Sequence, residues 1–291
     1  MNYRIEKDSM GEIKVPADAY YSAQTQRAVE NFPISGKGLD PHMIKAMGLV
    51  KLCAAKANFK LGLIPSDIHD FIVLASQEVI DGKFNAHFPI DVFQTGSGTS
   101  SNMNANEVIA KRANELAKEK NKELHIHPND HVNYGQSSND VFPTAIRIAS
   151  NLMVANHLLP KLNYLKSSLL NKGEEYKNIV KTGKTHLMDA MPVTFKQVFG
   201  GYARQVETAM ERIQNSVGHL HELPQGGTAV GTGINTHPKF AALFAQTLTE
   251  VTGVKFIEAK DHFEAQSTID APAELSAALK TSATSFLKIA N

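Results

Sequence analysis

Apolar residues recur at steps of three and four over two long stretches of this chain, residues 145–169 and 195–220. A period near 3.6 residues predicts amphipathic helices. Thr194 and Gln197 predict a capping box at the start of the second helix. Two apolar stripes of this length need partners, so we expect a helical bundle, formed within one chain or shared between subunits.

Shorter helical patterns cover much of the remaining chain, and strand patterns are few. Asn104 with Glu107 imitates a capping box, and Pro272 must kink or restart the helix in which it lies. Short strands are indicated only at residues 3–6 and 178–181. The shorter helices are expected at about residues 41–61, 67–81, 104–119, 238–252 and 262–290.

Turn-rich sequence gives way to long helices near residues 135–140, which indicates a domain boundary. We therefore expect a mostly α fold. A small N-terminal domain would cover residues 1–138, and a central helical-bundle domain would cover residues 139–291.

The charges nearly balance, with 30 Lys and Arg against 29 Asp and Glu. Nothing in the bulk charge would therefore attract nucleic acid or an anionic membrane. No apolar run approaches the roughly 18 residues of a membrane-spanning helix. The N-terminus lacks the apolar core of a secretory signal, so a cytoplasmic protein is expected. Cys53, the single cysteine, lies in a helical pattern and is expected to be a small core residue.

The polar segment at residues 94–104 combines glycines, hydroxyl side chains and a following helix. Glycines expose backbone N–H groups, Ser and Thr add donors, and the start of a helix adds partial positive charge. This combination suits an anion, although composition alone favours an ordinary Gly/Ser loop that ends in a helix cap. No Gly-Lys-Ser/Thr follows, so the segment is not a phosphate loop.

A second polar segment spans residues 125–131 and continues at 136–140. His125, His127 and Asp130 invite a metal interpretation, but no cysteine is nearby and no further ligands are indicated. A hydrogen-bonded turn with one functional histidine is the preferred interpretation. Two serines and an asparagine then precede a helix, of which the following aspartate, residue 140, is a candidate cap.

Two further polar segments lie at residues 182–190 and 225–235. The first contains His186, the most promising titrating group, because imidazole exchanges protons near neutral pH. A lone histidine is nevertheless more often structural than catalytic. The second is rich in glycine, which lets the backbone approach a ligand or another helix closely. Its Gly-x-Gly lacks the strand and helix context of a dinucleotide site.

Together these segments occur in the order found in class II fumarases, and the chain resembles that family over essentially its whole length. Residues 6–11 and 15–18 match the family as well. The matching motifs are Thr95-Gly96-Ser97-Gly98-Thr99, Ser101-Asn102-Met103-Asn104, His127-Pro128-Asn129-Asp130, Ser137-Ser138-Asn139-Asp140, Thr185-His186-Leu187 and Gly226-Gly227-Thr228-Ala229-Val230-Gly231-Thr232-Gly233.

The resemblance implies a fumarase/aspartase-like, mostly helical, three-domain subunit of a homotetramer, whose active sites are shared between subunits. It implies a hydro-lyase that hydrates fumarate reversibly to L-malate, a reaction of the tricarboxylic acid cycle. It also implies acid/base chemistry without a metal or another cofactor. The expected partners are a small dicarboxylate and further copies of the chain, with no nucleic acid and no membrane.

The resemblance also implies which residues hold the substrate. Ser97 and Thr99 would hold one carboxylate, and Ser137, Ser138 and Asn139 would do the same from another chain. Proton removal beside a carboxylate builds up negative charge, which fixed N–H and O–H donors can stabilise.

The reacting end is implied at Thr185 and His186, with His186 orienting or activating the water molecule. A second anion site near the first is implied at His127, Pro128, Asn129 and Asp130.

The chain departs from the family pattern at three places. Lys184 and Met188 stand where fumarases usually carry arginine and glutamine. Lysine keeps the charge but loses the two-pronged hydrogen bonding of arginine, so we expect tuning of the same reaction. The family's signature loop, Gly-Ser-Ser-x-Met-Pro-x-Lys-x-Asn, would follow the last helix and is not in this sequence. We therefore expect the helical domain to be incomplete and the chain alone to be inactive or nearly so.

Two alternatives remain at this point. Aspartate ammonia-lyase shares the fold, several motifs and fumarate as a product. The serines at 97–101 and 137–138 and the presence of His186 favour the hydratase, because the ammonia-lyase usually carries glutamine at the last position. The second alternative is a non-catalytic structural or binding protein on the same scaffold.

Overall fold

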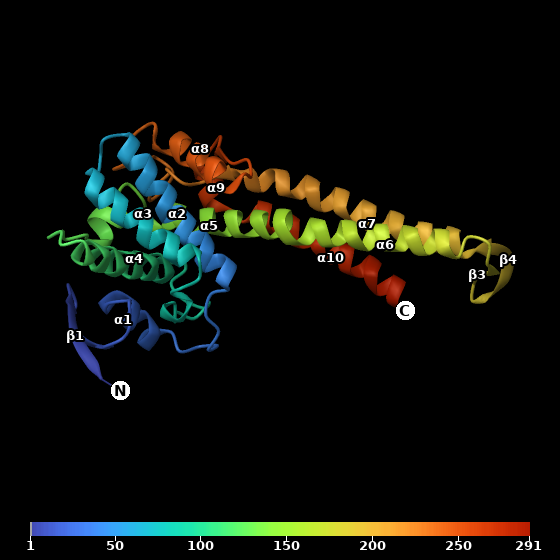
Figure 1. Ribbon diagram of the computed structural model, residues 1–291, viewed down its shortest axis with the longest axis horizontal. Helices are drawn as coiled ribbons and strands as arrows, with labels where there is room; N and C mark the ends of the chain where they lie inside the picture. Colours follow the sequence, from blue (N-terminus) through green and yellow to red (C-terminus); the bar gives the residue numbers. More distant parts are fainter. Residues whose placement is uncertain (1) are drawn as a thin grey trace. The chain divides into compact units, whose positions relative to one another are not determined.

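The computed structural model describes residues 2–291, and most of them are helical (Figure 1). Contacts divide the chain into two compact units. Unit 1 runs up to Ala149 and resumes at His221–Ile269, and unit 2 consists of Ser150–Leu220 and Asp270–Asn291. The predicted mostly α fold is confirmed. The expected domain boundary after residue 138 stays a prediction. Within residues 2–291, no helix has the length and apolar character needed to cross a membrane.

Unit 1 opens with a β-hairpin. β1 (Tyr3–Asp8) pairs antiparallel with β2 (Gly11–Pro16). The strand predicted at residues 3–6 is confirmed, whereas β2 was not predicted. The only apolar residues that alternate along β2 are Ile13 and Val15, which is too short a pattern to be distinctive.

The core of unit 1 is built on α2 (Pro41–Lys60), which is buried on nearly all sides. It packs against α3 (Ser66–Ile80), α4 (Thr99–Glu119) and α8 (Phe240–Thr252). Apolar area removed from water is worth about 25 cal/mol per Å², so a helix surrounded in this way anchors the unit. Cys53 is fully buried in α2, as predicted.

The start of α4 differs from the prediction. The helix begins at Thr99, so the capping box predicted from Asn104 and Glu107 is wrong, and both side chains are buried inside the helix. Asn104 donates to a carbonyl of η1 (Asn85–His87) at 2.9 Å. Glu107 accepts hydrogen bonds of 2.8–3.2 Å from the backbone at the start of α1 (Ala23–Asn31). Buried polar residues paired by tertiary contacts can therefore look like caps in the sequence.

The other elements of unit 1 are mostly short and surround the polar loops. β5 pairs with β6 in parallel, and η2 is a single π-helical turn. Their bounds are η2 (Pro128–Val132), α5 (Ser138–Met153, which continues into unit 2), β5 (Glu222–Leu223), β6 (Ile257–Glu258) and α9 (His262–Ser267).

Unit 2 contains α6 (Leu159–Glu175), α7 (Phe195–Val217) and α10 (Asp270–Ala290). In Figure 1, α6 and α7 run side by side, and α10 packs on α7. The two apolar stripes predicted from the sequence meet in this packing. The buried core consists of Val154, Leu162, Val206, Ile213, Leu220, Ala271 and Leu275.

The first long helix is interrupted, which the sequence pattern did not predict. A π-helical turn, η3 (Val154–Leu158), separates α5 from α6. Pro160 lies in the first turn of α6. Proline has no N–H group and its ring collides with the carbonyl four residues earlier, and a wider turn relieves both problems.

Two predicted helix starts in unit 2 are confirmed. Thr194 and Gln197 form the capping box of α7, with Gln197 N donating to Thr194 Oγ1 at 3.2 Å. Between α9 and α10 the helix stops, and it restarts at Asp270 with Pro272 in its first turn. The short η4 (Gly218–His221) follows α7.

A β-hairpin joins α6 to α7. β3 (Val180–Thr185) pairs antiparallel with β4 (Met188–Thr194). The predicted strand at residues 178–181 partly overlaps β3. β4 was not predicted, because Pro192 and the exposed Met188 and Met191 break any regular alternation.

Candidate functional site

The loop before α4 presents two hydroxyl groups to solvent. Gly98 adopts a left-handed backbone conformation with φ +68° and is buried under Phe142, where a side chain at residue 98 would overlap the aromatic ring. The exposed hydroxyls of Ser97 and Thr99 lie 2.8 Å apart. They stand at the N-terminus of a 21-residue helix, whose partial positive charge favours an anion.

Asp140 joins two of the polar segments. It lies in the first turn of α5, is fully buried, and accepts hydrogen bonds from Ser137 N (3.0 Å), Gly226 N (3.0 Å) and Thr228 N (2.9 Å). Burial raises the pKa of its carboxyl group, and these three donors oppose that shift. The helix begins at Ser138, so Asp140 lies inside its first turn and is not the N-cap that the sequence suggested. Its carboxylate accepts from Ser137 N, just before the helix, and also fixes the glycine-rich loop.

Ser97 and Asn139 line one pocket of about 590 Å³ in unit 1. Asn139 Nδ2 donates to Ala229 O at 2.7 Å, which holds the glycine-rich loop at the pocket. Three other predicted residues lie at the starts of the same helices, α4 and α5, but do not line this pocket. They are Thr99, Ser137 and Ser138. One chain therefore brings Ser97 and Asn139 together without a second chain. Most of the remaining pocket lining is apolar and includes Phe142, Pro143, Ile146, Val230, Phe263 and Ile269.

A buried lysine that no sequence pattern indicated supports these loops. Lys51 of α2 is fully buried, and its Nζ donates to Asn102 Oδ1 (2.7 Å), Asn133 Oδ1 (2.9 Å) and Gln136 Oε1 (3.0 Å). Burial lowers the pKa of Lys51 to about 7, and the charge of Asp140 opposes this. The available signal was a lysine inside an otherwise apolar helical run, since buried lysines are rare unless paired.

The predicted second anion site lies at η2. Pro128 begins this turn, and His127 Nδ1 faces the backbone N–H groups of Asn129 (3.3 Å) and Asp130 (3.2 Å). Asp130 Oδ2 lies 3.1 Å from the same ring nitrogen. The histidine is thus engaged with its own turn.

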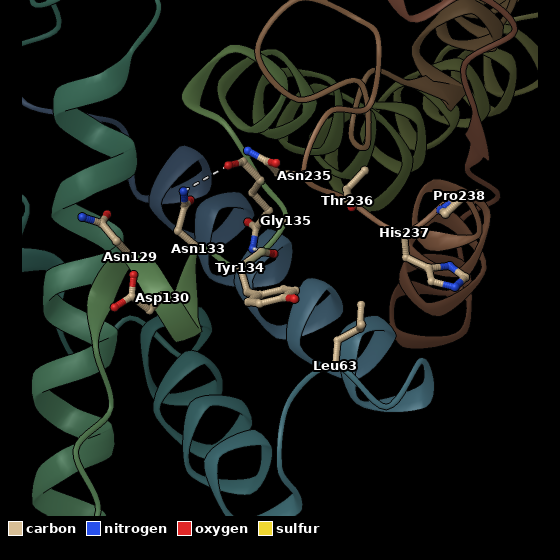
Figure 2. Close-up of a pocket in the computed structure, with 11 residues that line it drawn as sticks. Leu63, Asn129, Asp130, Asn133, Tyr134, Gly135, Asn235, Thr236, His237 and Pro238 are labelled. Carbon is tan, nitrogen blue, oxygen red and sulfur yellow. Dashed lines mark hydrogen bonds between the residues drawn. The ribbon is translucent and has the colours of Figure 1, made fainter.

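Asn129 and Asp130 also line a separate cavity of about 770 Å³, shown in Figure 2. Asn235, at the end of the glycine-rich loop, and the following Thr236 and His237 lie across the cavity from them. The lining is rich in amides and carries one acid, which suits hydrogen bonding more than anion binding. Within residues 2–291, no three His, Cys, Asp or Glu side chains gather closely enough to hold a metal ion.

Thr185 and His186 belong to unit 2, so they are not part of the polar cluster in unit 1. They lie at the tip of the hairpin, where Thr185 pairs with Met188. His186 and Leu187 form the turn with φ +49° and +63°. Left-handed conformations are uncommon for residues other than glycine and are typical of functional or turn positions. The side chain of His186 is exposed.

The fold is mostly helical, and loops rich in hydroxyl and amide groups lie at the starts of its helices. The sequence also matches a known protein family. The family profile described as Lyase matches residues 11–291, and the chain belongs to this family.

Within that family, the chain is similar to class II fumarases. It is 56% identical over 270 residues to the class II fumarate hydratase of Halobacterium salinarum, covering 93% of this chain and 57% of that protein. It is 53% identical over 290 residues to the Corynebacterium glutamicum enzyme of the same name, covering 99% and 60%. The chain thus spans about 60% of the length of these curated relatives.

Solved structures agree with this assignment. The class II fumarase of Schistosoma mansoni superposes with a TM-score of 0.95 at 38% identity, over 99% of this chain and 64% of that one. A fumarate lyase:delta crystallin from Brucella melitensis, bound to cobalt, gives a TM-score of 0.92 at 39% identity, over 100% and 64%.

Proposed function

We propose that this chain provides dicarboxylate-binding loops of a class II fumarate hydratase, which adds water reversibly across the double bond of fumarate to give L-malate. The observation that carries the proposal is the pocket lined by both Ser97 and Asn139. The names of the curated relatives supply the reaction and the substrate. The tricarboxylic acid cycle and the cytoplasm are the proposed setting.

The chemistry requires donors that stabilise negative charge. Removing a proton next to a carboxylate places a second charge on that group, and Ser97, Thr99, Ser137, Ser138 and Asn139 are proposed to hold the substrate carboxylates. A hydrogen bond to a charged group is worth about 1.5–3 kcal/mol. Enzymes lower barriers by roughly 8–23 kcal/mol, so several such donors must act together.

His186 is proposed to orient or activate the water molecule, next to Thr185. The exposed position of His186 at the tip of the hairpin supports this role, because it leaves the imidazole open to water and to a ligand. The second anion site is proposed at His127, Pro128, Asn129 and Asp130. An anion bound there would replace His127 Nδ1 as the acceptor of the Asn129 and Asp130 backbone N–H groups.

A homotetramer with shared active sites is also proposed. The hairpin that carries His186 exposes large apolar side chains, with Leu187 93%, Met188 70% and Met191 77% exposed. Exposed apolar groups on one short element are typical of a protein interface. Light scattering of the purified chain tests this. A tetrameric mass supports the proposal, and a monomer at micromolar concentration contradicts it.

Fumarate binding tests the proposed function directly. Calorimetry should detect binding by the unmodified chain, and Asn139→Ala should weaken it about tenfold or more, as expected for a lost hydrogen bond to a charge. The control is Asn215→Ala, which changes an exposed asparagine in α7 and should bind normally. Absence of binding by the unmodified chain, or equal binding by both variants, would contradict the proposal.

The reaction itself is followed by the loss of the ultraviolet absorbance of fumarate, with and without ammonium. Loss without ammonium supports a hydratase. Loss that requires ammonium would instead favour an ammonia-lyase.

A further inference from the structure

The side-chain amide of Asn102 has a fixed orientation. Its Oδ1 lies 2.7 Å from Lys51 Nζ, and its Nδ2 donates to Ser138 Oγ (3.0 Å) and Asn133 Oδ1 (3.2 Å). Lys51 Nζ donates to three side-chain oxygens at once, which takes all three hydrogens of its ammonium form and leaves no acceptor on the nitrogen. Flipping the amide would place its NH₂ group against the ammonium, so Lys51 decides which end of Asn102 faces Ser138.

This orientation determines what the hydroxyl of Ser138 can do. The oxygen of Ser138 accepts from Asn102, so its own hydrogen is left for another acceptor. Within residues 2–291, no acceptor takes that hydrogen. Ser138 is the first residue of α5, is half-buried, and neighbours Asn139 of the substrate pocket. A carboxylate oxygen is the acceptor that the proposed ligand would bring.

We propose that Lys51 is a positioning residue that, through Asn102, makes Ser138 a hydrogen-bond donor to a dicarboxylate. Lys51 itself is fully buried and does not touch the ligand. The identity of the ligand rests on the proposed function, whereas the orientation of Asn102 and Ser138 does not.

The orientation is tested without any ligand. In ¹⁵N-labelled protein, Ser138→Ala should shift one Asn102 side-chain amide proton and speed its exchange with water. Lys51→Met should alter both amide protons, because the acceptor end of Asn102 loses its partner. If Ser138→Ala leaves the Asn102 amide signals unchanged, the inference is overturned. The Ser138→Ala measurement tests the orientation even if the Lys51 variant does not fold.

The consequence for binding is tested with Asn102→Asp. Aspartate keeps the shape and the contact with Lys51 but cannot donate, so Ser138 must turn its hydrogen toward residue 102. Fumarate binding should weaken by roughly 10–100-fold, the range expected for losing a hydrogen bond to a charged group. In a protein that already carries Ser138→Ala, the same substitution should weaken fumarate binding far less.

Asn102→Asp is compared in the unmodified chain and in the Ser138→Ala chain. The introduced carboxylate repels fumarate in both proteins, so the difference between the two losses of affinity removes the effect of the added charge. Equal losses in the two backgrounds would overturn the inference. If the unmodified chain does not bind fumarate, the proposed function fails, and the amide measurement still decides whether Lys51 and Asn102 orient Ser138.

Discussion

Asp140 Oδ2 accepts a hydrogen bond from Gly226 N at 3.0 Å, although 86 positions separate the two residues in the sequence. The same oxygen accepts from Thr228 N at 2.9 Å. The start of α5 and the glycine-rich loop are therefore joined through one buried carboxylate. Two motifs that look independent in the sequence form a single structural element.

Replacing this carboxylate should destabilise unit 1. Asp140→Asn places an NH₂ group against backbone donors, and we expect the free energy of unfolding to fall by about 2–4 kcal/mol. Urea denaturation measures the change. Asp130→Asn is the matched control, because the side chain of Asp130 is 75% exposed and its removal should cost little. Equal effects of the two substitutions would contradict this view of Asp140.

Asp91 should stabilise the protein in a pH-dependent way. Burial opposes the shift, but hydrogen bonds from Phe93, Ser35 and Gly36 outweigh it and lower the pKa of Asp91 to about 2. A carboxyl group with a lowered pKa stabilises the fold fully above its ordinary pKa of 3.8. That contribution is lost as the pH falls toward 2.

The stability difference between the unmodified chain and Asp91→Asn should therefore be constant above about pH 4 and shrink at lower pH. Denaturation curves at several pH values measure it. A difference that does not change between pH 5 and pH 2 would be inconsistent with this pKa.

Cys53 should be chemically inert in the folded protein. It is fully buried, and burial raises the pKa of its thiol to about 12, so almost no thiolate exists near neutral pH. Iodoacetamide at pH 8 should label the folded chain very slowly and the urea-unfolded chain rapidly, as followed by mass spectrometry. Comparable rates in the two states would show that the site opens readily.

The capping box of α7 should contribute measurably to stability. Thr194→Ala removes the side chain that accepts from Gln197 N, and we expect a loss of about 1 kcal/mol. Thr208→Ala makes the same change at a partly exposed position inside α7 and should be neutral or stabilising, since alanine favours helices. Thermal unfolding of both variants decides the matter.

Local patterns predicted the parts of this structure that depend on local interactions. The apolar stripes of α6 and α7 have a clear period, and the box at Thr194 and Gln197 depends on neighbours three residues apart. The break at η3 was missed because the pattern continues through it, and Pro160 was the only warning.

The candidate site was only partly predictable, because its connections are long-range. The motifs pointed to the loops of Ser97 and Asn139, and a shared pocket within one chain required the fold. Lys51 was overlooked because its partners, Asn102 and Gln136, lie 51 and 85 positions away. No pattern of local period can reveal such a contact.

The close approach of Gly98 to Phe142 has an evolutionary consequence. A side chain at residue 98 would occupy the space of the aromatic ring, so residue 98 is not free to vary while Phe142 is present. A larger residue at 98 becomes tolerable only after the ring at 142 has been replaced by something smaller. Lineages that lose the glycine should therefore have lost the phenylalanine first, and the order of the two substitutions should be visible in reconstructed ancestral sequences.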